Sequence, residues 1–479
     1  MRPSPDQAAS HQTAPAALDG VDHAMVVGLG ASGLAAARLL RGARVRVTLV
    51  DDRSDHPAAE FARAEGFEVV LGRAPVDVLE ASMGLVVPSP GVPEHAPVLR
   101  VAATQGIPVW SEPELALRVH PRRLLAVTGT NGKTSTTELL AGMLAADGID
   151  AIPCGNIGRP VSEAAPAAPL DAVLVAELSS FQLRFAGRLR PEVGVVLNLA
   201  ADHLDWHPDL DAYGAAKARL WEAQRDGDWA VANADDPLTL ALQTRAAPAN
   251  RAVFSATAPV AVGVGRDGDH LVAAVPGHTG RVVEVAALSA VGPPAPHHVA
   301  NVAAAACTAL LAGCRPAAVA RAAAGYHPGR HRFEVVATDG RGVRYIDDSK
   351  ATNVHAAAAA LRAVDGAVWI AGGLSKGVDL SPLSADLGGV HDAVLLGAAA
   401  AELAEVCATA DVRAHRVGSM EDAVALAATL ARPGDTVLLA PACASFDQFR
   451  SYADRGERFA AAVRAVTTTA APSSRGGRS

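Results

Sequence analysis

Residues 126–140 read AVTGTNGKTSTTELL, so two glycines, a lysine and a run of hydroxyl side chains separate an apolar run from a helical pattern. A strand that passes through such a loop into a helix directs several backbone N–H groups at one point, where the helix dipole also favours an anion. Lys133 can then bridge the outer phosphates of a nucleotide, and the Thr134 hydroxyl can coordinate Mg²⁺. Val127 occupies the place of the usual first glycine, yet strand, loop and helix together predict a phosphate-binding site.

Two further apolar runs of the same region end in side chains that could hold a metal ion. Glu177 follows DAVLVA, and Asp202, His203 and Asp205 follow EVGVVLNLAA. Parallel strands bring their carboxyl ends to one edge of a sheet. A lone histidine there is more often a packing or hydrogen-bonding residue, but hard ligands on two strand ends beside a phosphate loop favour a metal site.

The lysines outside the phosphate loop fall into two groups. Lys217 lies within the helical pattern YGAAKARLW, and its type and position alone predict a solvated surface lysine. Lys350 and Lys376 instead follow apolar runs, in YIDDSKATN and IAGGLSKG. Lysines at the carboxyl ends of strands are unusual in a scaffold and indicate an anionic substrate. A third exit of this kind, APACASFDQFRSYADRG, carries Ser445 and Tyr452.

A glycine pattern near the N-terminus, Gly28-x-Gly30-x-x-Gly33, follows an apolar run and precedes an alanine-rich helix. VRVTLVDD supplies the next strand, so the segment predicts a βαβ unit of a dinucleotide-binding fold. The pattern does not identify NAD, because any nucleotide diphosphate could bind there and a structural glycine turn remains an alternative. An NAD-dependent oxidoreductase would leave the phosphate loop without a role, and a nucleotide-driven switch would not need Lys350 and Lys376.

The elements that must position these residues form three blocks in which strands alternate with helices. Such alternation predicts α/β domains with parallel sheets covered on both faces. We expect an N-terminal Rossmann-like domain, a central P-loop ATPase domain and a C-terminal Rossmann-like domain, in which Ser419 caps a helix. The predicted boundaries are 1–118 with a flexible extension over 1–22, 119–328, and 329–479 with a flexible tail over 467–479.

Composition limits the function classes. The chain has 479 residues, half of them apolar, which argues against a disordered protein. Acidic residues exceed basic ones by 50 to 42, which disfavours nucleic-acid binding. The five cysteines form no C-x-x-C pair, no apolar run approaches the ~18 residues that span a bilayer, and the N-terminus has no apolar signal region. We expect a cytoplasmic monomer without membrane insertion.

Seven stretches occur in an order that resembles one family. They are TGTNGKT, ELSSFQL, LNLAADHLD, HRFE, DDSKATN, GGLSKG and PACASFDQF, and they resemble the Mur ligase family of peptidoglycan synthesis over about residues 25–459. The phosphate loop and the Glu/His pair are shared with folylpolyglutamate synthases, whose activity is an alternative that the dinucleotide-like first domain disfavours. The SSFQL, DDSKATN and CASFDQF stretches indicate the branch that adds D-glutamate to UDP-N-acetylmuramoyl-L-alanine through an acyl phosphate.

The resemblance implies a role for each domain and for particular residues. The first domain would bind the UDP-sugar substrate, the second ATP with two Mg²⁺ ions, and the third the amino acid. Catalytic roles would fall to Lys133, Glu177, His203 and Lys217. The metal ligands would be Thr134, Glu177, His203 and Lys217, the last as an N-carboxylated (carbamate) side chain. The ATP-binding residues would be Gly129, Thr130, Asn131, Gly132, Lys133, Thr134, Ser135, Asn301, Arg332 and Asp348.

The same resemblance implies the two other substrate sites. The UDP-muramoyl substrate would contact Ser32, Asp51, Arg53, Ser89, Asn156 and Ser179. D-Glutamate would contact Lys350, Thr352, Lys376, Ser445 and Tyr452. Two positions depart from the family pattern: His298 replaces an asparagine of H-N-x-x-N, and Tyr452 replaces a common phenylalanine.

Overall fold

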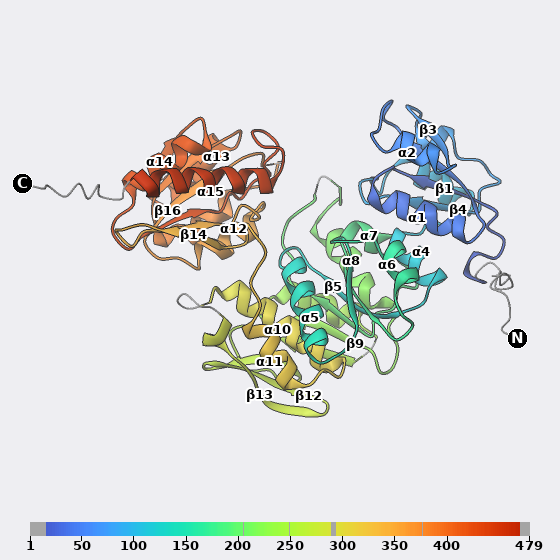
Figure 1. The fold of residues 1–479 in the computed structure, drawn as a ribbon, viewed down its shortest axis with the longest axis horizontal. Coiled ribbons are helices and arrows are strands. Elements are labelled where there is room, and N and C mark those ends of the chain that lie inside the picture. The colour runs from blue at the N-terminus through green and yellow to red at the C-terminus, as the bar shows by residue number, and fades with distance from the viewer. Residues whose placement is uncertain (1–15, 205, 249, 289–293, 376, 470–479) are drawn as a thin grey trace, which may run out of the picture. The chain divides into compact units, whose positions relative to one another are not determined.

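The structure is a computed structural model that describes residues 16–204, 206–248, 250–288, 294–375 and 377–469 (Figure 1). The chain forms two compact units. The first contains the residues before Ala200 together with Trp206–Glu284 and Val302–Ala323, and the second contains Ala200–Asp205, Val285–Asn301 and everything after Ala323. All three sheets are built mainly of parallel strands, so the expected three-domain α/β fold is confirmed.

The N-terminal sheet has the strand order β3-β2-β1-β4 and is parallel throughout. Its strands are apolar on both faces, with α1 packed on one face and α3 on the other. The elements are η1 (Ala16–Leu18), β1 (His23–Val27), α1 (Ala31–Gly42), β2 (Arg46–Asp51), α2 (Ala59–Ala64), β3 (Glu68–Leu71), η2 (Pro75–Asp77), β4 (Leu85–Pro88), α3 (Pro97–Thr104) and α4 (Glu112–Val119).

The central sheet has nine strands in the order β13-β12-β11-β10-β9-β8-β5-β7-β6. Its first elements are β5 (Arg123–Thr128), α5 (Lys133–Ala146), β6 (Ala151–Gly155), α6 (Val161–Ala167), β7 (Val173–Glu177), α7 (Ser180–Arg184), β8 (Val193–Val196), α8 (Leu210–Glu222), β9 (Trp229–Asn233) and α9 (Pro237–Ala246). The chain continues with β10 (Asn250–Phe254), β11 (Gly263–Asp267), β12 (His270–Val275), β13 (His278–Glu284), η3 (Val285–Leu288), α10 (Pro296–Leu311) and α11 (Pro316–Ala324).

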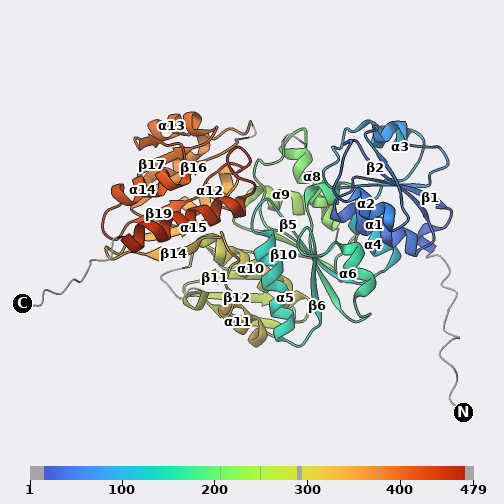
Figure 2. The ribbon, with the colours of Figure 1, turned by 45° about the horizontal axis from the view of Figure 1, so that its top comes forward.

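Strands β5 to β11 are parallel, but β12 pairs antiparallel with β11 and with β13 at the edge of the central sheet. The central sheet is therefore mainly parallel, as predicted, with an antiparallel hairpin at this edge that the prediction did not include. A hairpin forms because residues 270–275 alternate between half-buried and buried and are followed by Pro276 and Gly277, a turn pair in which Gly277 has φ +83°. Figure 2 shows this edge with β11, β12 and α11 side by side.

One continuous core joins the N-terminal and central sheets. Leu40 of α1, Leu115 of α4, Val161 of α6 and Leu174 of β7 belong to the same buried cluster. Helix α4 contacts both α1 and α6, so its apolar side chains serve both sheets. The two sheets therefore fold as one compact unit, and the boundary proposed at 118/119 falls in the last turn of α4.

The C-terminal sheet has the order β14-β15-β19-β16-β17-β18, with β14 antiparallel to its neighbour. Helices α12 and α13 cover one face, and α14 and α15 cover the other. Ser419 caps α14 by accepting a hydrogen bond from the Asp422 backbone N–H at 3.1 Å, as predicted. The elements are β14 (Glu334–Thr338), β15 (Arg344–Asp347), α12 (Val354–Leu361), β16 (Ala367–Gly372), η4 (Ser381–Gly389), β17 (Val390–Leu396), α13 (Ala400–Thr409), β18 (Arg413–Arg416), α14 (Met420–Leu430), β19 (Thr436–Leu439) and α15 (Tyr452–Thr469).

The structure corrects both predicted flexible ends. Residues 16–18 form a 3₁₀ turn, and Leu18 is buried in the first core, so the range predicted as a flexible extension includes ordered residues, and residues 1–15 lie outside the described chain. Helix α15 continues to Thr469, so the predicted tail overlaps its last turn, and residues 470–479 lie outside the described chain. Within the described ranges, no helix is long and apolar enough to cross a membrane.

A buried carboxyl group at the start of α4 gives the first testable prediction. Glu112 is 2% exposed, and desolvation raises its pKa to about 7, although the Ser162 N–H donates to it. Between pH 4.5 and pH 7 the folded chain therefore holds a proton that the unfolded chain releases, and stability falls as pH rises, by about 3 kcal/mol in total. Denaturant unfolding of Glu112→Gln at pH 5 and pH 8 is expected to lack this loss. An equal loss in both proteins would contradict the interpretation.

Candidate active site

The phosphate loop joins β5 to α5 and is held open by contacts with the neighbouring strand. Gly129 has φ +150°, and a Cβ there would lie 2.9 Å from the Leu197 Cβ, so glycine is required. Asn198, which follows β8, accepts from the Asn131 N–H at 2.8 Å and donates its amide to the Asn131 carbonyl at 3.1 Å. The N-terminus of α5 has no side-chain cap. Its first N–H groups are therefore oriented as an anion site requires.

Two lysines converge on one backbone oxygen of this loop. Lys133 Nζ donates to the Gly129 and Thr130 carbonyls at 2.9 and 2.8 Å, and Lys217 Nζ donates to the same Gly129 carbonyl at 2.8 Å. Lys217 is 1% exposed and lies 4.3 Å from the centre of the Tyr213 ring. The expectation of a solvated surface lysine is wrong, because α8 packs against β5 and β8 and turns this side chain toward the loop.

Glu177 ends β7 and is paired with Val127 of β5, two residues before Gly129 of the phosphate loop. Its Oε1 accepts from the Asn156 side-chain amide at 2.8 Å, and its carbonyl accepts from the Asn156 N–H at the same distance. Glu177 is 2% exposed, and within the described chain its Oε2 has no hydrogen-bond partner. A buried carboxylate oxygen without a partner, beside a loop with the Thr134 hydroxyl, fits a hard cation such as Mg²⁺.

Four of the six predicted UDP-sugar residues, Ser32, Asp51, Arg53 and Ser89, lie at the carboxyl edge of the N-terminal sheet. Asp51 is buried and accepts from the Leu29 N–H and, at 2.8 Å on each oxygen, from the Arg53 guanidinium. These contacts, led by that of Arg53, lower the pKa of Asp51 to about 2. Ser89 donates to the Gly28 carbonyl at 3.3 Å, and Ser32 lies in the first turn of α1.

The glycines of this edge have a structural explanation of their own. Gly28 has φ +96°, and a Cβ on Gly33 would lie 2.1 Å from the Gly28 carbonyl oxygen. Close packing of α1 on β1 therefore requires Gly33 whether or not a ligand binds. Ser179, placed in the same substrate site by the resemblance, forms a capping box with Gln182 at the start of α7. That contact gives Ser179 a structural role as well.

In the second unit, the structure brings Lys350 and Tyr452 together. Lys350 Nζ lies 3.9 Å from the centre of the Tyr452 ring, and its N–H donates to the His331 carbonyl at 3.1 Å. Thr352 N–H donates to the Lys350 carbonyl at 2.8 Å, and Ser445 is buried after β19. Lys376 lies outside the described residues.

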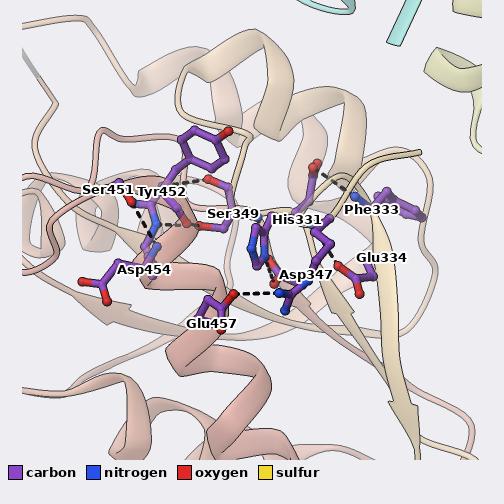
Figure 3. Close-up of polar contacts among 12 residues, drawn as sticks. His331, Phe333, Glu334, Asp347, Ser349, Ser451, Tyr452, Asp454 and Glu457 are labelled. Atoms are coloured by element: carbon purple, nitrogen blue, oxygen red, sulfur yellow. Dashed lines mark hydrogen bonds and ion pairs between the residues drawn. The ribbon is translucent and has the colours of Figure 1, made fainter. Parts of the chain in front are cut away.

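Arg332 lies in a strained loop between His331 and Phe333, whose φ angles are +65° and +55°. His331 Nδ1 is hydrogen-bonded to Asp347 at 2.7 Å, and Phe333 N–H donates to Asp348 (Figure 3). Glu334 accepts from the His331 N–H at 3.0 Å. Desolvation raises the pKa of Asp348 to about 7. This network fixes the loop that carries Arg332.

The remaining predicted nucleotide and metal residues also belong to the second unit. His203 has φ +55°, and its N–H donates to Asp202 at 2.9 Å. Asp202 in turn accepts from the Asn353 side-chain amide at 3.0 Å, and Asn353 also caps α12. Asn301 is a half-buried residue of α10.

Sequence reasoning missed three residues of this site. Asn198 lies in LNLAADHLD and Asn353 in DDSKATN. The residue type alone does not distinguish an asparagine whose amide is hydrogen-bonded to a loop from one that is solvated. Tyr213 had a usable signal, because it precedes Lys217 by four residues on a predicted helix and so shares its face.

Three family models match the chain along its length. Residues 22–111 match the "Mur ligase MurD-like, N-terminal domain", 127–309 the "Mur ligase middle domain" and 331–443 the "Mur ligase, glutamate ligase domain". The three α/β sheets and the phosphate loop fit an ATP-dependent ligase. Because the three family models together match most of the chain, the chain belongs to the Mur ligase family.

Two similar curated proteins carry the same name. UDP-N-acetylmuramoylalanine--D-glutamate ligase of Frankia casuarinae is 49% identical over 451 residues, 92% of this chain and 93% of the relative. The enzyme of that name from Thermobifida fusca is 45% identical over 460 residues, 92% of this chain and 98% of the relative.

Solved structures share the fold at low identity. MurF from Acinetobacter baumannii has a TM-score of 0.60 at 16% identity, covering 94% of this chain and 98% of its own. MurF of Thermotoga maritima, solved in complex with ADP, has a TM-score of 0.56 at 16% identity, covering 94% and 95%.

Proposed function

We propose that this protein is an ATP-dependent ligase that adds D-glutamate to UDP-N-acetylmuramoyl-L-alanine in the cytoplasm, with ADP and phosphate as the other products. The observation that carries the proposal is the convergence of Lys133 and Lys217 on the Gly129 carbonyl, beside the buried carboxylate of Glu177. The similarity to D-glutamate ligases over 92% of the chain supports the choice of substrates.

The reaction needs a nucleotide because a carboxylate has a poor leaving group. The L-alanyl carboxylate attacks the γ-phosphorus of ATP, the bond to the β–γ bridging oxygen breaks, and ADP leaves. The amine of D-glutamate then attacks the carbonyl of the resulting acyl phosphate. Phosphate leaves with the bonding electron pair, and the amine loses a proton. The α5 N-terminus and Lys133 offset the charge on the phosphoryl oxygens, so that two anions can approach each other.

Thr134 and Glu177 would hold one Mg²⁺ ion, and His203 with a carbamate on Lys217 would hold a second. Bound there, the ions would supply positive charge to the phosphate oxygens. The buried Nζ of Lys217 already contacts the phosphate loop, which supports its assignment to this site.

The other substrates are assigned by the charge and position of the surrounding side chains. We assign the UDP-muramoyl substrate to the edge formed by Ser32, Asp51, Arg53 and Ser89. Asn156 and Ser179, which follow strands of the central sheet, are added to this site on the resemblance alone. We assign the D-glutamate carboxylates to Lys350, Thr352, Ser445 and Tyr452, and we add Lys376 on the resemblance alone, because it lies outside the described residues.

Arg53 gives a prediction specific to the UDP-sugar. Its guanidinium is oriented by Asp51 but is 59% exposed, so its loss should leave the fold intact. Arg53→Met is expected to raise the KM for the UDP-muramoyl substrate about tenfold, because a hydrogen bond to a charged group is lost, and to leave the KM for ATP unchanged. The matched control is Arg46→Met at the start of β2, where the arginine is 63% exposed. Equal effects of the two substitutions would contradict the assignment.

The proposed function is tested by ADP release from the purified protein with Mg²⁺, ATP and the UDP-muramoyl substrate. We expect release with D-glutamate and little with L-glutamate, D-alanine or no amino acid, together with a product whose mass includes one glutamate. Release that is independent of any amino acid, or that is stimulated best by another one, would overturn it.

A further inference from the structure

Arg455 is a buried cation that no site assignment above uses. It lies in the first turn of α15 and is 1% exposed, although arginine is among the residues least often buried. Burial lowers its pKa to about 10, so it remains charged at neutral pH. No carboxylate in the described part of the chain lies within 4.0 Å of its guanidinium.

The guanidinium connects the carboxyl ends of three strands. Nε donates to Ser349 Oγ at 3.0 Å and Nη2 to the Ser349 carbonyl at 2.9 Å, just after β15. Nη1 donates to the Gly372 carbonyl at the end of β16, at 3.3 Å, and to the Cys443 carbonyl after β19, at 3.0 Å. Ser349 Oγ itself donates to the Tyr452 carbonyl at 2.8 Å, a contact drawn in Figure 3.

These loops carry the side chains assigned to D-glutamate. Lys350 follows Ser349, Ser445 lies two residues after Cys443, and Tyr452 begins the helix that contains Arg455. The packing is close, since a Cβ on Gly373 would lie 3.2 Å from Arg455 Nη1 and 2.1 Å from the Ala444 carbonyl oxygen. Without the guanidinium, three buried carbonyls would lose their donor and the loops their common anchor.

The charge of Arg455 has a second consequence. The two carboxylates that act on it, Asp447 and Asp347, are hydrogen-bonded to other groups. Asp447 accepts from the Ala398 N–H, and Asp347 accepts from the Ser349 N–H and is paired with His331. A guanidinium bound only to carbonyls and a hydroxyl leaves its positive charge acting on the sheet edge, where low dielectric weakens screening.

We propose that Arg455 is a positioning residue for the amino-acid substrate. It fixes the three loops at the carboxyl edge of the C-terminal sheet, and its charge favours an amino acid with two carboxylates over one with an uncharged side chain. The proposal rests on the proposed function for the identity of that amino acid.

The test compares Arg455→Met, Arg455→Lys and Ser349→Ala with a control, Arg458→Met, which removes a half-exposed arginine of the same helix. Arg455→Met is expected to raise the KM for D-glutamate about 30-fold, to leave the KM for ATP within twofold, and to lower the preference for D-glutamate over D-glutamine. Arg455→Lys should restore that preference but not the KM. Ser349→Ala, which removes one hydroxyl, should raise the KM for D-glutamate about fivefold.

Equal changes in every KM, or an unchanged KM for D-glutamate, would overturn the proposal. If Arg455→Met shows no cooperative thermal unfolding, the KM values of Ser349→Ala replace those of Arg455→Met in this comparison. An unchanged KM for D-glutamate in Ser349→Ala would then overturn the proposal. Failure of the proposed function gives a different outcome: the wild-type protein would then use another amino acid, and the KM for that one would respond to Arg455→Met.

Discussion

Replacing Lys133 by methionine is expected to reduce kcat/KM for ATP-dependent ligation at least about 1000-fold. The substitution removes one of the two lysines that contact the phosphate loop and keeps a side chain of similar length. The Gly129 carbonyl retains a donor, because Lys217 Nζ also lies 2.8 Å from it, so the loop should keep its conformation. The measurement is steady-state ADP release, accompanied by thermal unfolding.

The control is Arg122→Met, which also removes a positive charge and lies just before β5. The Arg122 guanidinium donates to the backbone carbonyls of Pro121 and Ala168 and lies outside the phosphate loop. It should keep wild-type kinetics. A Lys133→Met protein that retained a tenth of wild-type activity would contradict the role assigned to the phosphate loop.

Glu177→Gln should lower kcat/KM about 100-fold and raise the Mg²⁺ concentration needed for half-maximal activity. Glutamine can still accept from the Asn156 amide through its carbonyl oxygen, so the contact at 2.8 Å is preserved. It replaces the unpartnered, negatively charged Oε2 by an amide nitrogen, which cannot ligate a cation. The thermal unfolding temperature should stay the same or rise, because a buried charge is removed.

The control for this substitution is Glu192→Gln, which removes a carboxylate that is 40% exposed and paired with Arg123. Its Mg²⁺ requirement should match that of the wild type. If Glu177→Gln changes activity but not the Mg²⁺ requirement, the carboxylate acts in another way.

The parts of the site that are continuous in sequence could be predicted, because each contains its own geometric signal. The loop from Gly129 to Lys133 is bounded by a strand and a helix, and its anion-binding geometry follows from that order alone. The same holds for Gly28 and Gly33, where turn and helix packing impose glycine.

Burial and long-range contacts could not be predicted in the same way. Lys217 and Arg455 lie on helices whose inward faces are set by tertiary packing, so the sequence pattern gave no reason to place either cation inside. The hairpin of β12 and β13 could have been predicted from the sequence. It consists of two short strand-like segments that are joined by the Pro276–Gly277 turn. The shared core around Leu115 also joins two predicted domains that sequence blocks alone treat as separate.

The central claim is that the substrate carboxylate is activated by transfer of the terminal phosphoryl group of ATP. The most direct measurement uses UDP-N-acetylmuramoyl-L-alanine with ¹⁸O in the alanyl carboxylate, and mass analysis of the released phosphate. The mechanism predicts one ¹⁸O atom in each phosphate, because the carboxylate oxygen that attacks phosphorus leaves with it. Phosphate without ¹⁸O, formed alongside the ligated product, would contradict the account.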